Sequence, residues 1–333
     1  MSNGPALIVH NLKTYFFTRR GIVRAVDGVS FEVNKAETLG LVGESGSGKS
    51  VTCFSIMGLV PNPPGKIVEG EILFKSENLI RKSPAEMRKI RGSGISMSFQ
   101  DPMTYLNPVM RVGDQIAEAI LLHKNVDNEK AFEMAVHAMK LTEISNAERR
   151  AHDYPHQLSG GMRQRVLIAM AIACEPDILI ADEPTTALDV IVQQEILELL
   201  RNLSVELSTA MILVSHDLGV VAEVCDRAAV MYAGNIVEVA TIKELFENPL
   251  HPYTRALMES IPRADRGKQR LLTIPGSVPD LIDPPSGCKF NPRCPYVAAE
   301  CKRDPPLLEK ISSSGSHYVA CVKYAEIQSM RRS

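Results

Sequence analysis

The sequence of 333 residues has little of what several classes of protein need. Its formal net charge is only −2, so it offers no overall attraction to nucleic acid or to an anionic membrane. The longest uninterrupted apolar run covers residues 166–174, which is too short for a bilayer, because a spanning helix needs about 20 residues. The N-terminus has no basic segment followed by an apolar one, so we expect no export signal and a cytoplasmic protein.

Paired cysteine motifs are also missing, although the chain contains seven cysteines. In a reducing compartment these thiols argue against a disulfide framework. We interpret Cys53, Cys174 and Cys225 as small core residues, because each lies in apolar helical surroundings. The other four lie close together near the C-terminus and need a separate explanation.

The most informative stretch is Gly43–Ser50, which matches the pattern G-x-x-x-x-G-K-[ST]. The apolar run before it, residues 38–42, predicts a buried parallel strand, and residues 51–59 predict a helix after it. Glycines in such a loop let backbone N–H groups turn toward a nucleotide's phosphates, and the helix N-terminus adds partial positive charge. Lys49 is expected to reach the β- and γ-phosphates, and the Ser50 hydroxyl to ligate Mg²⁺. The candidate phosphate-binding residues are Gly43, Ser45, Gly46, Gly48, Lys49 and Ser50.

Apolar patterns along the rest of the chain predict an α/β protein. Strands are predicted at residues 7–11, 22–33, 67–74, 94–99, 177–183 and 211–214. A capping box that begins at Ser83 predicts a helix to about residue 91. Residues 113–123 and 129–141 have helical spacing, so we interpret 101–157 as a helical insertion into the core. An aromatic cluster at residues 15–17 fits packing and an adenine platform equally well.

A second candidate anion site lies at Ser159, Gly160 and Gly161, which open a helix predicted to reach about residue 173. Free N–H groups and a hydroxyl at a helix start suit a phosphate. The nucleotide of the same subunit already has a helix N-terminus at the loop, so this second site is expected to serve another subunit.

Three further polar residues follow predicted strands. Asp182, at a strand end, suits Mg²⁺, and Glu183 suits a base that orients an attacking water. His216 follows the strand at 211–214 and is a candidate sensor of the γ-phosphate, although a lone histidine is more often structural.

Taken together, these motifs resemble those of the ATP-binding-cassette ATPases over roughly residues 6–245, in the family's order and spacing. The resemblance implies a P-loop core with an antiparallel β subdomain and a helical subdomain at about 101–157. Residues 43–50 would be the Walker A loop, 158–164 the signature sequence and 186–189 the D-loop.

The same resemblance assigns roles to single residues. Asp182 and Glu183 would be the Walker B aspartate and the catalytic glutamate, and His216 the switch histidine. Gln100 would be the Q-loop residue, with a catalytic role and a contact to Mg²⁺. Phe16, with Tyr15 as the alternative, would stack on the adenine of ATP.

The C-terminal part resembles the extension of the ATPase subunits of bacterial dipeptide and oligopeptide permeases. The similarity covers residues 248–257, 274–279 and 287–295, so we expect an ATPase domain at 1–245 and a small irregular extension at 246–333. The resemblance implies an ATP-hydrolysing subunit on the cytoplasmic face of the membrane. Its partners would be a second, different ATPase, two transmembrane permease subunits and, indirectly, a peptide-binding protein, but no nucleic acid. The alternatives are an importer of nickel, glutathione or oligosaccharides, a soluble cassette ATPase, and a scaffold for iron–sulfur clusters.

The extension is rich in proline and poor in periodicity, so we expect it to need a staple other than a hydrophobic core. Four thiols at Cys288, Cys294, Cys301 and Cys321 suggest a metal site, with His317 as an alternative ligand. The lack of a C-x-x-C pair disfavours zinc. The resemblance favours a 4Fe–4S cluster, and zinc and free thiols remain as alternatives.

Overall fold

The computed structural model describes residues 4–186, 188–260, 274–311 and 316–329. The chain divides into two compact units, each assembled from several stretches. Unit 1 contains residues 1–6, 33–38 and 81–214, and unit 2 contains residues 7–32, 39–80 and 215–333. The described residues of the expected extension, 246–333, therefore lie in unit 2, whereas the expected ATPase domain contributes to both units.

Unit 1 is built on three parallel strands, β6 (Ile95–Ser98), β7 (Ile178–Asp182) and β8 (Ala210–Ser215). Every residue of these strands is buried, which explains their nearly continuous apolar sequence. Parallel pairing brings the carboxyl ends of β6 and β7 to one edge of the sheet. Gln100 and Glu183, which follow these two strands, therefore emerge at the same edge.

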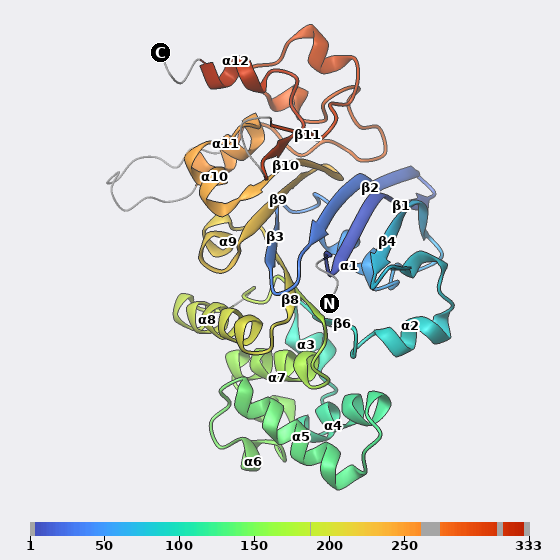
Figure 1. Ribbon diagram of the computed structural model, residues 1–333, viewed down its shortest axis with the longest axis vertical. Coiled ribbons are helices and arrows are strands. Elements are labelled where there is room, and N and C mark those ends of the chain that lie inside the picture. Colours follow the sequence, from blue (N-terminus) through green and yellow to red (C-terminus); the bar gives the residue numbers. More distant parts are fainter. Residues whose placement is uncertain (1–3, 187, 261–273, 312–315, 330–333) are drawn as a thin grey trace. The chain divides into compact units, whose positions relative to one another are not determined.

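The helices of unit 1 are α2 (Pro84–Ile90), α3 (Pro102–Tyr105), α4 (Val112–His123), α5 (Asn128–Leu141), α6 (Ala147–Arg150), α7 (Gly160–Ile172) and α8 (Val190–Glu206). Of these, α3, α4, α5 and α6 lie within residues 101–157 and confirm the predicted helical insertion (Figure 1). Residues of α4, α5, α6 and α7, among them Ile116, Met139 and Val166, share one apolar core. At the start of α2, Ser83 and Glu86 form the predicted capping box. All of residues 101–157 are described, and they contain no strand.

Unit 2 contains the expected antiparallel subdomain, a sheet of four strands in the order β2-β1-β4-β5. These are β1 (Leu7–Thr18), β2 (Gly21–Val33), β4 (Gly65–Phe74) and β5 (Glu77–Asn78). The prediction ended the first strand at Asn11, but β1 continues to Thr18 and includes the aromatic cluster. The register between β1 and β4 shifts between His10 and Thr14, and this irregularity hid the apolar alternation on which the prediction depended.

The other paired strands of unit 2 join the expected ATPase domain to the extension. β3 (Thr38–Val42) pairs in parallel with β9 (Arg227–Tyr232), and β10 (Asn235–Thr241) pairs antiparallel with β9. The extension adds β12 (Tyr318–Val319) beside β10, and β11 (Glu309–Lys310) beside β12. Backbone pairing therefore fixes part of the extension directly to the core.

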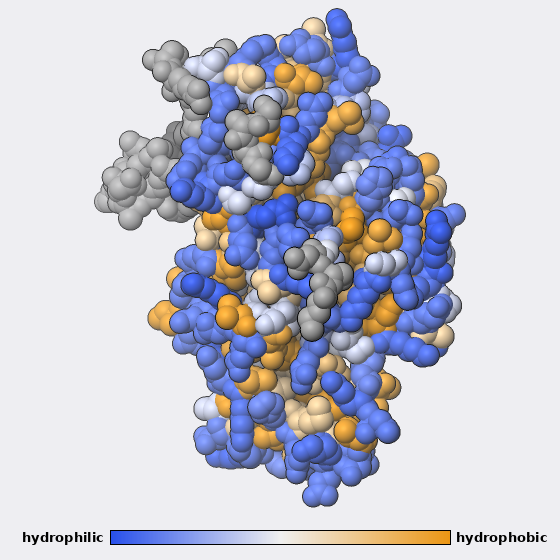
Figure 2. Space-filling model, in the orientation of Figure 1, coloured by the Kyte–Doolittle hydropathy of each residue, from blue (hydrophilic) through white to orange (hydrophobic). Residues whose placement is uncertain are grey.

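The helices of unit 2 are α1 (Lys49–Ile56), α9 (Leu218–Val224), α10 (Ile242–Glu247), α11 (Pro252–Glu259) and α12 (Tyr324–Ser329). α1 follows β3 through the phosphate loop, as predicted. In the described part of the chain, no helix has the length and apolar character of a membrane span. The face drawn in Figure 2 is mostly hydrophilic, with separate hydrophobic spots.

Candidate nucleotide-binding site

The loop Gly43–Ser50 has a backbone that only glycine can adopt at two positions. Gly48 has a φ of +104, and a Cβ there would lie 2.4 Å from the carbonyl oxygen of Ala25. A Cβ on Gly43 would lie 2.1 Å from the carbonyl oxygen of Met231. Strands on either side thus confine the loop closely, and glycine lets the loop wrap within that space.

Polar groups of the loop are available for an anion. Lys49 is 4% exposed, and its Nζ donates hydrogen bonds to the carbonyl oxygens of Gly43 (2.7 Å) and Glu44 (3.1 Å). The Ser47 hydroxyl is buried and has no hydrogen-bond partner among the described residues. Ser45 and Gly46 form the exposed tip of the loop, and Ser50 is the second residue of α1. A buried ammonium, an unpaired hydroxyl and a helix N-terminus fit the phosphates of a nucleotide.

Strand geometry separates the two candidate adenine-stacking residues. Side chains alternate along a strand, so Thr14 and Phe16 share one face of β1 and Tyr15 lies on the other. The Thr14 hydroxyl bonds the Ser55 hydroxyl of α1 at 2.8 Å, so the face with Phe16 is the one that meets the phosphate-loop helix. On the opposite face the Tyr15 hydroxyl donates to Asp27 at 2.6 Å, and burial helps raise the pKa of Tyr15 to about 12. Phe16 therefore lies on the face of β1 that meets α1, and Tyr15 lies on the opposite face.

The carboxylates after β7 lie in unit 1. Asp182 is the last residue of β7 and is 3% exposed. Glu183 has a φ of +45, a conformation that is strained for a residue with a side chain. Its Oε2 accepts hydrogen bonds from Gln100 Nε2 at 3.0 Å and from Thr186 Oγ1 at 3.1 Å. Three residues that the sequence placed in separate motifs therefore form one hydrogen-bonded group.

The Mg²⁺ ligands expected from the sequence have suitable chemistry. Carboxylate and hydroxyl oxygens are the hard donors that Mg²⁺ prefers. The Asp182 carboxylate at the end of β7 and the Ser50 hydroxyl at the start of α1 supply such oxygens. Asp182 belongs to unit 1 and Ser50 to unit 2.

The second candidate anion site has the local structure that the sequence predicted. Ser159 is the N-cap of α7, and its hydroxyl accepts a hydrogen bond from the Met162 N–H at 3.3 Å. Gly160 and Gly161 form the first turn of α7. A Cβ on Gly161 would lie 2.6 Å from Cγ1 of Val192 in α8, so this glycine also allows the two helices to approach closely.

The last two candidate motifs follow β7 and β8. His216 comes directly after β8, is exposed, and precedes α9. Asp189, the last residue of the D-loop, caps α8 by accepting from the Val192 N–H at 3.0 Å. Ala187 of the D-loop lies outside the described residues.

Comparison with known proteins identifies both parts of the chain. Residues 26–186 match the family model described as ABC transporter, and residues 237–301 match the oligopeptide/dipeptide transporter C-terminal region. A probable peptide ABC transporter ATP-binding protein of Sinorhizobium fredii is 51% identical over 322 residues, 96% of either chain. The dipeptide transport ATP-binding protein DppD of Bacillus subtilis is 52% identical over 315 residues, 95% of this chain and 93% of DppD.

Solved structures with the same fold are cassette proteins. A dimeric structure of the ATP-binding cassette MJ0796 bound to ADP and Pi has a TM-score of 0.64 and 28% identity. The match covers 71% of this chain and 98% of the MJ0796 chain. The cbiO1 protein of Clostridium perfringens, part of the cbiONQ transporter complex, has a TM-score of 0.63 and 29% identity over 73% of this chain and 91% of its own.

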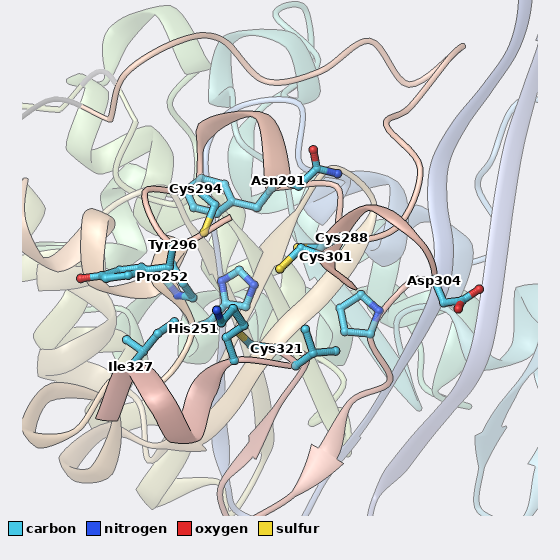
Figure 3. A pocket seen from close by; sticks show the side chains of 14 residues that line it. His251, Pro252, Cys288, Asn291, Cys294, Tyr296, Cys301, Asp304, Cys321 and Ile327 are labelled. Atoms are coloured by element: carbon cyan, nitrogen blue, oxygen red, sulfur yellow. The ribbon is translucent and has the colours of Figure 1, made fainter. Parts of the chain in front are cut away.

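The metal site predicted in the extension is wrong. Cys288, Cys294, Cys301 and Cys321 do line one pocket, together with His251 (Figure 3). However, no group of three or more His, Cys, Asp or Glu side chains in the described ranges could hold a metal ion. The relatives named above are transport ATP-binding proteins, and neither name mentions an iron–sulfur cluster.

Burial affects the cysteines that line this pocket. It raises the pKa of Cys288 to about 11 and that of Cys321 to about 12. The other possible ligand, His317, is bonded to Glu238 at 2.7 Å. The 4Fe–4S cluster and the zinc alternative are therefore withdrawn, and the four cysteines are free thiols.

Aromatic packing holds the extension where a metal was expected. Phe290 is 1% exposed, and its ring centroid lies 5.2 Å from that of Tyr232 and 5.4 Å from that of Tyr253. Tyr232 is the last residue of β9, so Phe290 ties the extension to the rest of unit 2, beside a small apolar cluster of the extension's own residues Leu250, Ile311 and Val319. The sequence prediction failed because it judged the extension in isolation.

Proposed function

This chain belongs to the ATP-binding-cassette ATPases, and we propose that it hydrolyses ATP to power an importer of dipeptides or oligopeptides. The observation that carries the peptide assignment is the match of residues 237–301 to the C-terminal region of oligopeptide and dipeptide transporters. The core cannot carry it, because the cbiO1 protein of a different transporter complex has the same core. The proposed extension, residues 246–333, contains most of the matching region.

ATP binding is assigned to the loop and to β1. Backbone N–H groups of Gly43–Ser50 surround the phosphates, and Lys49 neutralises charge that develops during phosphoryl transfer. Phe16 stacks on adenine, a role supported by its position on the face of β1 that meets α1. The Asp182 carboxylate and the Ser50 hydroxyl each have an oxygen that would suit Mg²⁺, and a bound Mg²⁺ would neutralise phosphate oxygens in this type of reaction.

Glu183 is proposed to orient the attacking water. The hydrogen bonds from Gln100 and Thr186 fix its carboxylate before a water arrives, which lowers the reorganisation that the reaction needs. Because Gln100 is bonded to Glu183 and lies just before the helical insertion, it is the natural link between the phosphates and that insertion. His216 is proposed to contact the γ-phosphate.

The chain is proposed to work at the cytoplasmic face of a membrane as one ATPase of a pair, with two permease subunits and a peptide-binding protein. Ser159, Gly160 and Gly161 of one subunit would complete the nucleotide site of the other. The exposure of Ser159 and Gly160 at the start of α7 supports this arrangement. The MJ0796 cassette, which has the same fold, is dimeric in its solved structure.

Transport by the complex tests the proposal. The full chain is purified with its membrane partners, reconstituted into vesicles with ATP on the side of the ATPases, and supplied with the peptide-binding protein. We expect ATP-dependent uptake of a labelled dipeptide or oligopeptide, and none in a complex that carries Glu183→Gln. Uptake of nickel, glutathione or an oligosaccharide in place of peptides would contradict the peptide assignment.

A further inference from the structure

One residue of the phosphate loop, Glu44, is held by the C-terminal extension. Its carboxylate receives two hydrogen bonds from the Arg293 guanidinium, Nη1 to Oε2 at 2.7 Å and Nη2 to Oε1 at 3.0 Å. Its backbone N–H donates to the Tyr253 hydroxyl at 2.8 Å. Both ends of Glu44 are therefore fixed by residues that are about 210 to 250 positions later in the sequence.

The residues around Arg293 hold its guanidinium in place for this contact. Its side chain is 5% exposed, and its Nε donates to the carbonyl oxygen of Pro275 at 2.9 Å. Nη1 also reaches the Tyr232 hydroxyl at 3.3 Å, and the guanidinium lies over the rings of Tyr232 and Phe290. The planar group therefore has little freedom left to lose when it binds a carboxylate.

The backbone of Glu44 connects the Arg293–Glu44 contact to Lys49, the proposed phosphate-binding lysine. The carbonyl oxygen of Glu44 accepts a hydrogen bond from Lys49 Nζ at 3.1 Å. The position of the Glu44 backbone thus sets where one partner of the Lys49 ammonium lies. A shift of Glu44 would be passed to the lysine that is proposed to bind ATP.

We propose that Arg293 and Tyr253 are positioning residues for the phosphate loop, through which the C-terminal extension sets the ATP affinity of its own subunit. The proposal rests on the proposed ATP-binding function. It assigns the extension a role in the ATPase reaction of this chain, separate from any role in peptide recognition.

Equilibrium binding of ATPγS with Mg²⁺ to the full chain, by titration calorimetry, tests the proposal. We expect Arg293→Ala to weaken binding about tenfold, because a bidentate charge-assisted contact is lost. Tyr253→Phe, which keeps the ring and removes the hydroxyl, should weaken binding about threefold. Arg293→Lys restores one of the two bonds and should fall between Arg293→Ala and the wild type.

Lys289→Ala is the matched control. Lys289 belongs to the same extension and pairs with Asp27 of the core at 3.0 Å, but it does not contact the phosphate loop. A general loosening of the extension could also weaken ATPγS binding. In that case Lys289→Ala and Arg293→Ala would weaken binding equally, and the proposal would be wrong. We expect Lys289→Ala to bind ATPγS within twofold of the wild type.

Further outcomes separate this proposal from the proposed function. A wild-type chain that binds no ATPγS would contradict the proposed function itself. If the wild type binds ATPγS and the affinity of Arg293→Ala is within twofold of the wild type's, only the positioning role would be overturned. If circular dichroism shows Arg293→Ala to be unfolded, Tyr253→Phe decides, because its unchanged affinity would equally overturn the proposal. In steady-state assays the role predicts a raised KM for ATP with kcat nearly unchanged.

Discussion

At the scale of single residues, Glu183 and Lys49 have different proposed roles in ATP hydrolysis, so their substitutions should have different effects. Glu183→Gln removes the charge that orients water while it keeps an oxygen that can accept from Gln100. We expect ATP turnover to fall at least about a hundredfold with ATP binding retained. Phosphate release and ATPγS binding measure the two effects separately. By contrast, Lys49→Ala should weaken the binding of ATPγS itself. A normal turnover rate in Glu183→Gln would refute the catalytic assignment.

At the scale of residues, the sequence predicted local structure where a motif carries its own geometry. The strand, loop and helix around Gly43–Ser50 and the N-cap Ser159 depend on neighbours within a few positions, and the structure has both as predicted. The choice between Phe16 and Tyr15 stayed open, because it needs the strand face that only the Thr14–Ser55 bond reveals. The Arg293–Glu44 pair was out of reach, since no local pattern links residues 249 positions apart.

At the scale of elements, the sequence predicted those with a clear period. Helices α4 and α5 and strands β6 and β7 all fall within a few residues of their predicted bounds. The extension was misjudged because its order comes from other elements. Its strand β12 pairs with β10, and its Phe290 packs on Tyr232 of β9. Cysteine spacing gave no sign of either contact, so a metal seemed necessary where aromatic packing suffices.

The start of α11 should make the extension sensitive to acid. His251 is 1% exposed, and its Nδ1 accepts a hydrogen bond from the Tyr253 N–H at 3.0 Å, which requires a neutral ring. Burial lowers the pKa of His251 to about 3, whereas an unfolded histidine has a pKa of about 6.5. Between these values the unfolded chain binds more protons, so stability is lost as pH falls below about 6.5, by up to about 1.4 kcal/mol per pH unit.

Denaturant unfolding between pH 7 and pH 4 measures this effect against His251→Asn. Asparagine can still cap α11, but it does not titrate. Glu238, which accepts from the His251 N–H and from His317, is present in both proteins and serves as a common background. We expect the wild type to lose stability more steeply than His251→Asn. Parallel pH profiles would show that His251 does not remain neutral in the folded extension.

At the scale of the whole molecule, the second anion site implies a partner. In the proposed function a nucleotide in the phosphate loop faces the N-terminus of α1, so we expect the N-terminus of α7 to serve a nucleotide on another ATPase. The isolated chain should therefore be largely monomeric and slow to hydrolyse ATP. Light scattering with size-exclusion chromatography should show an ATP-dependent dimer when Glu183→Gln is mixed with its partner ATPase. Ser159→Arg should prevent this dimer, because its side chain blocks the start of α7.

We expect that partner to be a different chain, because the resemblance to dipeptide and oligopeptide permeases implies paired, non-identical ATPases. A purified transporter with two copies of this chain and no second ATPase would refute the hetero-pair.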